Sequence, residues 1–234
     1  MSLIEHLTEL RTMVVRVVIT LAVSFMLCYS LGEHLINFLL VPLRDSLGAA
    51  VEGQIVYLGL LDKVLTQFQL AFFASVIFAS PVWFVFLWRF IKPGLYEHEV
   101  KAVRPFILVG FLLFLLGVAF GYYIVFPLTF ETLLNFGVQD IKATIGLKDY
   151  VLLASKVLVF LGFAFQLPNL LLILGFMGLV TKQSLRGMRR YVYVGLAVFS
   201  AMLTPPDVLT MMGLWVPMAI LFECGILAVA IIVH

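Results

Sequence analysis

Long apolar runs, separated by short polar stretches, make up most of the chain. A helix needs about 20 apolar residues to cross the hydrocarbon core of a bilayer. The pattern therefore predicts six transmembrane helices within a single domain, residues 1–234. They are expected near residues 13–31, 68–90, 106–126, 157–179, 192–203 and 211–233. The fifth run is short, so it is expected to thin the bilayer locally or to cross it nearly upright.

Two connecting stretches carry a helical pattern of their own. Residues 32–43 and 139–151 both place apolar residues at helical spacing. This spacing favours short helices that lie in the membrane interface and cap the outer side of the bundle. Ordinary connectors with some apolar packing are the alternative.

Prolines recur inside or at the ends of the predicted spans. They are Pro81, Pro127, Pro168 and Pro217. Each removes one helical hydrogen bond and tends to kink its helix. Kinked neighbours favour a concave wall over a straight bundle, although membrane helices also tolerate proline without this consequence.

The composition agrees with lipid as the main solvent. Hydrophobic residues make up 63% of the chain and charged residues only 12%, whereas soluble domains are roughly 45–50% apolar and about 25% charged. The expected fold class is therefore an all-α membrane protein. Cys28 and Cys224 lie far apart in apolar runs, which favours small buried side chains over a disulfide or a metal pair.

The placement of basic residues favours one orientation, with both the N-terminus and the C-terminus inside. Lys and Arg near the ends of spans gather on the cytoplasmic side of a membrane. With the N-terminus inside, ten of the 15 basic residues fall on the inner side. The other five, on the outer side, are Arg44, Lys63, Lys142, Lys148 and Lys156.

Enzyme signatures are absent from the sequence. HEVKA (98–102) begins like the zinc motif HExxH, but Ala102 stands where the second histidine ligand is required. There is no GxSxG and no P-loop. We therefore expect no catalytic residue, no metal and no cofactor, and nothing in the pattern indicates a nucleic-acid partner.

Two acids on the inner side are the first candidates for a binding site. Glu9 lies in EHLTELR and Glu99 in YEHE. A guanidinium matches a carboxylate in bidentate geometry, so two separated carboxylates can hold two arginines of a guest peptide. The alternatives are a solvated helix start for Glu9 and pairing of the loop acids with nearby basic residues for Glu99.

The second candidate is a polar position in the middle of the fourth predicted span. Gln166 and Pro168 lie within a long apolar run. Two interpretations stay open: a polar notch that faces a pocket, and an interhelical hydrogen bond worth about 0.6–2 kcal/mol. Glu223, in the last span, is a further intramembrane acid that we rank below Gln166.

Five segments, taken in order, resemble the TatC family, the multispanning receptor subunit of the twin-arginine protein translocase. They are HLTELR (6–11), FASPVWFVFLWRFIKPGLYEHE (78–99), GYYIVFPLTF (121–130), GFAFQLPN (162–169) and LTPPD (203–207). The resemblance covers nearly the whole chain, whereas VYLGLLDKV (56–64) departs from the more polar pattern of the family.

The resemblance implies a function and a set of residues. Members of the family bind twin-arginine signal peptides at the cytoplasmic face and help to export folded proteins with the proton-motive force. The family's recognition carboxylates fall on Glu9 and Glu99, with Arg11 and Phe90 in the same motifs. Pro42 and Asp207 also match, as structural or hinge positions. Together with Pro168, they are expected to serve as structural or hinge residues.

The resemblance also implies partners and a location. Expected partners are twin-arginine signal peptides, single-span TatA/TatB-type subunits and the lipid bilayer, within a multi-copy complex. The expected location is the cytoplasmic (inner) membrane of a bacterium or archaeon, ahead of a thylakoid or mitochondrial membrane. The family often has glutamate where this chain has Gln166, so a proton relay at this position is put in doubt. A secondary transporter of a small solute or ion, with a polar mid-membrane site, is the alternative function.

Overall fold

The structure is a computed structural model that describes residues 3–47, 55–91, 105–134, 144–204 and 207–232. Nearly all of these residues are helical, as the sequence predicts. The elements in chain order are α1 (Leu3–Ser30), α2 (Gly32–Leu47), β1 (Ile55–Val56), α3 (Asp62–Phe78), α4 (Ser80–Ile91), α6 (Pro105–Phe120), the π-helical turn η3 (Gly121–Val125), α7 (Phe126–Leu134), β2 (Ile145–Gly146), α8 (Leu147–Ala164), α9 (Leu167–Phe176), α10 (Lys182–Leu203) and α11 (Val208–Ile232).

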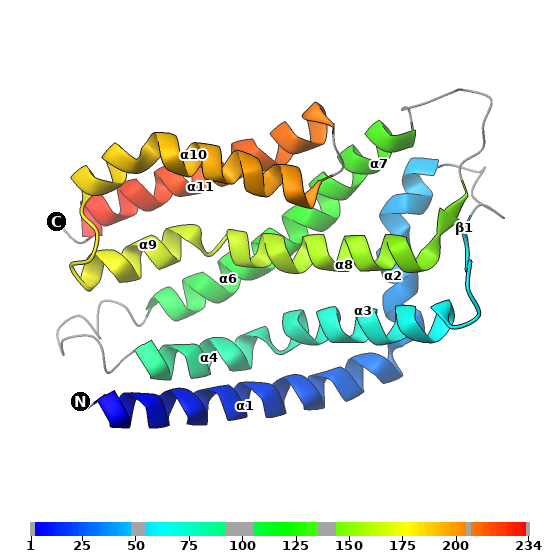
Figure 1. Cartoon of the computed structure of the whole chain (residues 1–234), viewed down its shortest axis with the longest axis horizontal. Helices are drawn as coiled ribbons and strands as arrows, with labels where there is room; N and C mark the ends of the chain where they lie inside the picture. Colours follow the sequence, from blue (N-terminus) through cyan, green and yellow to red (C-terminus); the bar gives the residue numbers. More distant parts are fainter. Residues whose placement is uncertain (1–2, 48–54, 92–104, 135–143, 205–206, 233–234) are drawn as a thin grey trace.

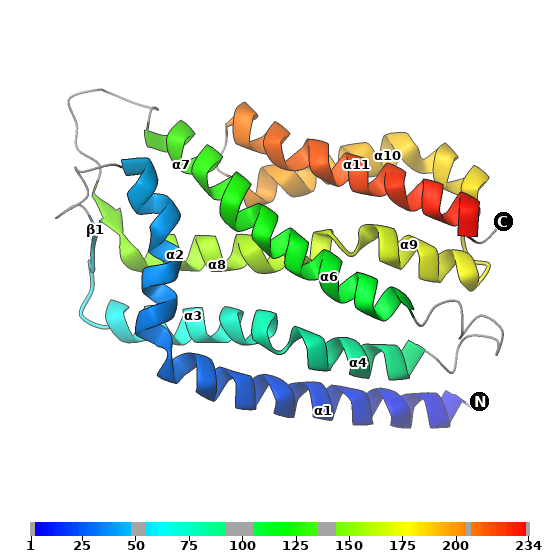
Figure 2. The ribbon, with the colours of Figure 1, turned by 180° about the vertical axis from the view of Figure 1, so that it is seen from behind.

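The helices form one main row with a second set crossing behind it. In Figure 1, α1, the α3–α4 pair, the α8–α9 pair, and α10 with α11 run along the long axis one above the other. Behind this row α6 and α7 cross the molecule obliquely, and α2 closes one end (Figure 2). The start of α1 and the end of α11 lie at the opposite end from α2.

One short pairing interrupts the helical pattern. Strands β1 and β2 pair in parallel, with Ile55 opposite Ile145 and Val56 opposite Gly146. The pairing joins the segment before α3 to the segment before α8. It therefore ties two connections together at the end of the molecule that carries α2 (Figure 1).

The core is built around α8 and an aromatic cluster beside it. Val151 and Leu161 of α8 are fully buried, as is Phe114 of α6. The Phe114 ring meets the ring of Trp83 on α4 at a centroid distance of 5.5 Å, and that of Phe163 on α8 also at 5.5 Å. These contacts fix α4, α6 and α8 against one another.

Within the described residues, four helices are long and apolar enough to cross a membrane, at Leu7–Ser30, Ile107–Thr132, Leu147–Phe176 and Val208–Ile231. A fifth candidate is the pair Asp62–Phe78 and Ser80–Phe90, which is bent by 56°. The predicted run 192–203 lies in α10, which is not among these candidates and carries basic residues along its first nine positions. The count of six spans therefore stays a prediction.

The helix that carries the fourth predicted span begins earlier than that span. The predicted boundary at residue 157 follows the charge of Lys156, whereas α8 begins at Leu147 and continues through this lysine without a break. The candidate span Leu147–Phe176 has 30 residues, about 45 Å of helix, which is longer than the roughly 30 Å hydrocarbon core. The placement of Lys156 in an outer segment therefore stays a prediction.

The two interfacial helices have different outcomes. The helix expected over residues 32–43 is confirmed as α2, which extends to Leu47. The separate helix expected over 139–151 is wrong for the part that the structure describes, because residues 145–146 form β2 and residues 147–151 are the first turns of α8. Residues 139–143 lie outside the described residues.

The prolines break helices in two places and are accommodated in two others. Pro81 and Pro168 lie near the first residues of α4 and α9, directly after breaks in the chain's helical path. A proline is well placed there, because the first turn of a helix does not use its N–H groups. Pro42 and Pro217 lie inside α2 and α11, which continue past them.

The contact between α6 and α8 leads to a stability prediction. A Cβ atom added to Gly117 would lie 2.6 Å from the backbone carbonyl oxygen of Leu161, which cannot rotate away. We expect Gly117→Ala to push α6 from α8 and to lower the free energy of unfolding by about 1–3 kcal/mol. Thermal unfolding in detergent measures this.

The control is Gly195→Ala on α10. A Cβ atom there would meet nothing within 4 Å, and alanine is the better helix former, so stability should be unchanged or slightly raised. Equal melting temperatures for both variants would contradict the close approach of α6 and α8.

Candidate functional site

Glu9 lies on the inward face of α1. Glu9, Met13, Val17 and Leu21 recur at four-residue spacing and are all partly covered. The Oε2 atom of Glu9 is buried and has no hydrogen-bond partner. Buried polar atoms are nearly always paired, so an unpaired one requires an explanation. An open carboxylate oxygen can accept a hydrogen bond from an incoming donor.

Phe90 lies at the same end of the molecule as Glu9. Helices α1 and α4 pack side by side, and the start of α1 lies beside the end of α4 (Figure 1). Phe90 is half-buried near the end of α4. The structure therefore brings an aromatic ring and a carboxylate from two different helices to one end of the bundle.

Two other residues, Arg11 and Glu99, were also predicted to bind the signal peptide. Arg11 is exposed. It follows Glu9 by two residues, which places it on nearly the opposite side of the helix. The structure does not bring Arg11 to the face that carries Glu9. Glu99 lies outside the described residues.

Among the residues that the structure describes, no basic side chain forms an ion pair with the carboxylate of Glu9. Within the described part of the chain the ion pairs are Lys148–Asp62, with Nζ and Oδ1 3.1 Å apart, and Arg189–Glu223, with Nη2 and Oε2 2.5 Å apart.

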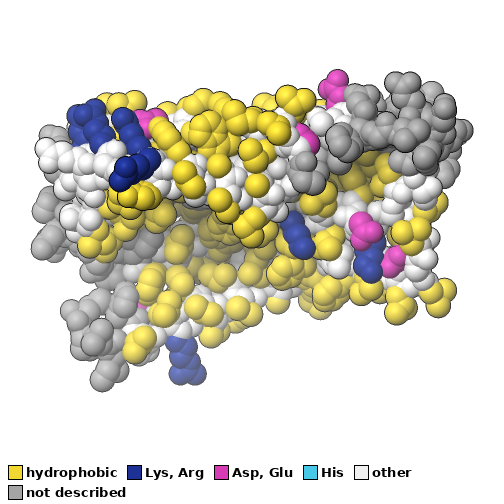
Figure 3. Space-filling view, turned by 45° about the horizontal axis from the view of Figure 1, so that its top comes forward, with side chains coloured by type: hydrophobic (Ala, Val, Ile, Leu, Met, Phe, Trp, Pro, Cys, Tyr) yellow, Lys and Arg dark blue, Asp and Glu magenta, His cyan; other side chains and the backbone are white. Residues whose placement is uncertain are grey.

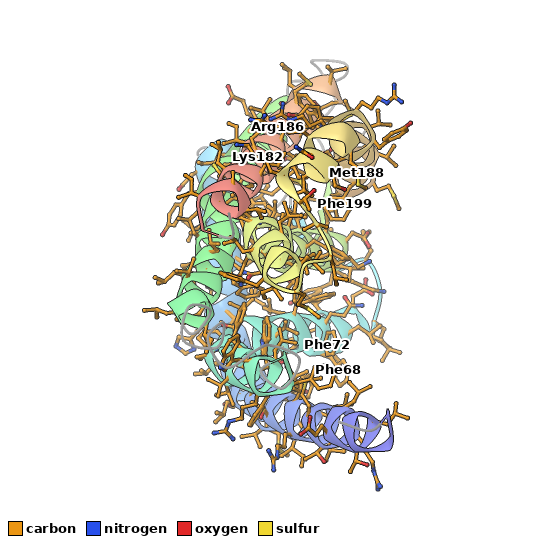
Figure 4. All side chains as sticks on the ribbon, turned by 90° about the vertical axis from the view of Figure 1, so that its left-hand side faces the viewer. Phe68, Phe72, Lys182, Arg186, Met188 and Phe199 are labelled. Atoms are coloured by element: carbon orange, nitrogen blue, oxygen red, sulfur yellow. The ribbon has the colours of Figure 1, made fainter. Side chains whose placement is uncertain are left out.

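Figure 4 looks onto the end of the molecule where α1 begins and labels Lys182 and Arg186 at the start of α10. Figure 3 shows basic side chains gathered at this end of α10.

Gln166 lies in the break between α8 and α9. Its Nε2 donates a hydrogen bond of 2.8 Å to the carbonyl oxygen of Gly110 on α6, and its Oε1 accepts one of 3.3 Å from Nδ2 of Asn169. The amide therefore forms the interhelical hydrogen bond that was one of the two interpretations. The backbone approaches closely here, because a Cβ added at Gly110 would lie 2.6 Å from Nδ2 of Asn169 and would displace this amide.

The same amide also borders a cavity, and its role as a polar notch stays a prediction. The cavity has a volume of about 270 Å³. It is lined by Trp83, Phe84, Leu87, Trp88, Ile107, Phe163, Gln166, Asn169, Leu170 and Ile173. Asn169 is buried, and its Oδ1 has no hydrogen-bond partner. The pocket is thus aromatic, with an open acceptor next to Gln166.

Asn169 is a residue that the sequence reasoning missed. It follows Gln166 by three residues, a spacing that places two side chains on the same helical face. The aromatic residues that line the cavity gave no comparable signal in the sequence, because Trp83 and Phe163 lie on segments far apart along the chain.

Pro168, Asp207 and Pro42 have structural surroundings. Pro168 is buried in the first turn of α9. Asp207 caps α11: its Oδ1 accepts a hydrogen bond of 2.8 Å from the backbone N–H of Thr210, and its Oδ2 accepts one from the Thr210 hydroxyl. Such a cap satisfies a free N–H at the start of a helix. Pro42 is buried within α2.

Glu223 is engaged in a contact between α10 and α11. Its carboxylate accepts hydrogen bonds from the guanidinium of Arg189 and from the hydroxyl of Tyr193. The indole of Trp215 donates to the carbonyl oxygen of Tyr193 at 2.9 Å. These bonds join the two helices, and the carboxylate is not open to another group in the way that Glu9 is.

Comparison with known proteins identifies the family. A family model described as Sec-independent protein translocase protein (TatC) matches residues 5–217. The chain is 38% identical to the TatC protein of Magnetococcus marinus over 224 residues, which is 96% of this chain and 82% of that protein. It is 34% identical to the TatCy protein of Bacillus subtilis over 229 residues, which is 97% of this chain and 88% of that protein.

Comparison with solved structures identifies the same family. A crystal structure of the twin-arginine translocase receptor TatC matches with a TM-score of 0.85 at 30% sequence identity, covering 98% of this chain and 100% of that one. The chain therefore belongs to the TatC family of Sec-independent protein translocase proteins.

Proposed function

We propose that the chain is the receptor and scaffold subunit of a twin-arginine translocase. It binds twin-arginine signal peptides at the cytoplasmic face and helps to export folded proteins with the proton-motive force. The observation that carries the proposal is the buried, unpaired Oε2 of Glu9. As a member of the TatC family the chain is a multi-pass component of a protein translocase and not an enzyme.

The recognition step follows from the chemistry of the carboxylate. A guanidinium presents a planar fork of N–H donors that a carboxylate can accept in pairs. Glu9 supplies one such acceptor next to the half-buried Phe90. We assign the second acceptor to Glu99. Arg11 lies on the other side of α1, so its role is with the membrane surface or the peptide's acidic groups and not with the arginine pair.

We propose a six-span topology with both ends inside. The start of α1 and the end of α11 lie at the same end of the molecule (Figure 1), as an even number of spans requires. The basic start of α10 lies at this end as well (Figure 4), in keeping with the cytoplasmic bias of Lys and Arg. In this arrangement the helices form a concave, glove-like wall that is open to a guest segment, with α2 on the outer side.

The partners and location follow from the same assignment. We propose that single-span TatA/TatB-type subunits join this chain in a multi-copy complex in the cytoplasmic (inner) membrane of a bacterium or archaeon. A lipid-spanning helix would dock against the outward faces of α10 and α11. Exposed apolar side chains there include Val198, Met202 and Ile220.

The small-solute transporter has no support from the comparisons. The amide of Gln166 is already paired with Gly110 and Asn169. We propose that it acts as a fixed, uncharged polar wall of the aromatic cavity and that it does not relay protons.

Binding of a labelled twin-arginine signal peptide tests the receptor assignment. Because Glu9→Gln removes the charge and keeps the size, we expect its affinity to fall by at least about tenfold, the cost of losing one buried charge-assisted contact. A peptide with two lysines in place of the arginines should bind the unmodified chain weakly. Fluorescence anisotropy in detergent measures both.

The matched control is Glu33→Gln, which removes an exposed acid at the start of α2, at the other end of the molecule. It should leave peptide affinity unchanged. The receptor site is misplaced if Glu9→Gln binds the twin-arginine peptide as tightly as the unmodified chain does.

The role of Gln166 is tested by Gln166→Glu. An ionised carboxylate cannot donate to the carbonyl oxygen of Gly110, so this oxygen would lose its partner. We expect the free energy of unfolding to fall by about 1–3 kcal/mol at pH 8. Thermal unfolding at pH 5 and pH 8 checks this, because a protonated glutamic acid can restore the donor. If the variant is as stable as the unmodified chain at both pH values, the proposed structural role of the Gln166 amide is contradicted.

A further inference from the structure

Asn169 carries a hydrogen-bond acceptor that the fold does not use. Its side chain lies in a residue that is only 8% exposed, yet its Oδ1 atom has no hydrogen-bond partner. A buried polar atom without a partner destabilises the protein, so its presence requires an explanation. Asn169 lies near the start of α9 and borders the cavity of about 270 Å³ beside Gln166. The wall of this cavity therefore contains a buried acceptor that is open to a donor.

The backbone of α6 determines that the free atom is an acceptor. The carbonyl oxygen of Gly110 can only accept, so the Nε2 donor of Gln166 faces it at 2.8 Å. The Oε1 atom of Gln166 then accepts from the Nδ2 atom of Asn169 at 3.3 Å. Because each side-chain amide has one nitrogen donor group and one oxygen acceptor, this chain of hydrogen bonds ends at the Oδ1 atom of Asn169. A guest that completes the chain must bring an N–H or an O–H group.

Aromatic rings form much of the remaining wall, and they are held in place. Those that line the cavity are Trp83, Phe84 and Trp88 of α4 and Phe163 of α8. The ring of Trp83 stacks on that of Phe84 at a centroid distance of 4.2 Å and on that of Phe163 at 5.6 Å. The indole N–H of Trp83 donates to the carbonyl oxygen of Val76 at 2.9 Å, so this donor is already used. A preformed wall of rings favours an aromatic guest, which can stack on it or meet it edge to face.

The cavity is uncharged and reaches the surface. Among the residues that the structure describes, no charged side chain lines it. The transfer of an ion from water into such a site is costly, so the guest must be neutral. Leu87, Phe163 and Leu170, which line the cavity, are exposed and give access to it. An apolar cavity of about 150 Å³ is large enough for benzene, so this one has room for a substituted ring.

We propose that the cavity is a binding site for a neutral aromatic molecule that carries one hydrogen-bond donor, such as a phenol or an indole. The ring packs against Trp83 and Phe163, and its O–H or N–H donates to the Oδ1 atom of Asn169. The molecule enters from the apolar phase that surrounds the helices. It contacts α4 and the α8–α9 pair at the break beside Gln166. The proposal goes beyond the receptor assignment and does not depend on it.

The chemistry of the cavity favours this guest over two other occupants. A water molecule needs about two to four polar partners. The amide side chains that line the cavity are Gln166 and Asn169, and these already bond to each other. An acyl chain fills apolar volume but has no donor for the open oxygen. An aromatic donor satisfies both the rings and the oxygen.

The test compares 4-bromophenol with 4-bromoanisole, in which a methyl group replaces the hydroxyl hydrogen. Both probes carry a bromine atom, which quenches tryptophan fluorescence on contact. Trp215→Phe leaves Trp83 and Trp88, which both line the cavity, as the fluorophores. Titration in detergent at pH 7, where the phenol is neutral, gives the affinity for each probe at equal concentration in the micelle. We expect the phenol to bind about tenfold more tightly than the ether, because it alone can donate to the buried acceptor.

Variants of the chain assign this preference to the cavity. Asn169→Leu keeps a similar size and lacks the acceptor, so it should bind the two probes equally. Asn37→Leu makes the same change at an exposed position of α2 and should keep the preference. Ile173→Phe narrows the cavity at an apolar lining residue and leaves both amides in the chain, so it should weaken the binding of both probes.

Three results would overturn the proposal. The first is equal affinity of the unmodified cavity for the two probes, since the open oxygen would then need no donor from a guest. The second is a preference that survives Asn169→Leu, and the third is binding of both probes that Ile173→Phe does not change. The probe pair and Ile173→Phe decide the matter even if Asn169→Leu fails to fold. The measurement contains no twin-arginine peptide, so failure of the Glu9 experiment leaves its result unchanged.

Discussion

The structure depends on a constraint set by lipid. The hydrocarbon core holds no water that could hydrogen-bond a polar group, so each such group needs a partner within the protein. The protein meets this constraint by aiming polar side chains at backbone carbonyls of other helices. Tyr122 donates to Phe38 at 2.7 Å, and Tyr150 donates to Leu39 at 2.6 Å. Both bonds fasten α2 across the end of the bundle. Ser24 joins α1 to α3 in the same way. Each bond stabilises a helix contact that apolar packing alone would leave free to slide.

One of the exceptions to this rule coincides with the site where we propose peptide recognition. Glu9 keeps a buried, unpaired oxygen at one end of the molecule. A buried charge without an ionic partner destabilises the free protein, and pairing with a guest of opposite charge removes this destabilisation. A receptor that must release its guest benefits from this arrangement, because its own residues do not compete for the site. Glu223 shows the contrast, since its carboxylate is engaged by Arg189 and Tyr193.

The sequence was informative where a local pattern carries the signal. Apolar periodicity located α1, α2, α6 and α11 with modest errors at their ends, and the QLPN segment marked the break between α8 and α9. It failed where tertiary contacts decide. The pattern did not indicate that α8 extends back to Leu147, beyond the predicted boundary at Lys156. There Lys148 pairs with Asp62 of α3, a contact between segments far apart in sequence. The aromatic residues of the cavity beside Gln166 come from two segments, α4 and α8, and no local pattern indicates which rings meet.

The carboxylate of Glu9 was predicted, but the reason for its importance was not. Spacing alone allowed it to be a solvated helix start. The structure places it on the packed face of α1, in line with Val17 and Leu21, where a carboxylate has no value for packing. An alanine or leucine at this position would fit such a face better. The presence of an acid there is therefore explained by something outside the fold, namely a donor that arrives and leaves. By contrast, the neutral Gln166 is explained within the fold by its bond to Gly110. We therefore assign the working charge of this chain to the end that carries Glu9, and not to the middle of its core.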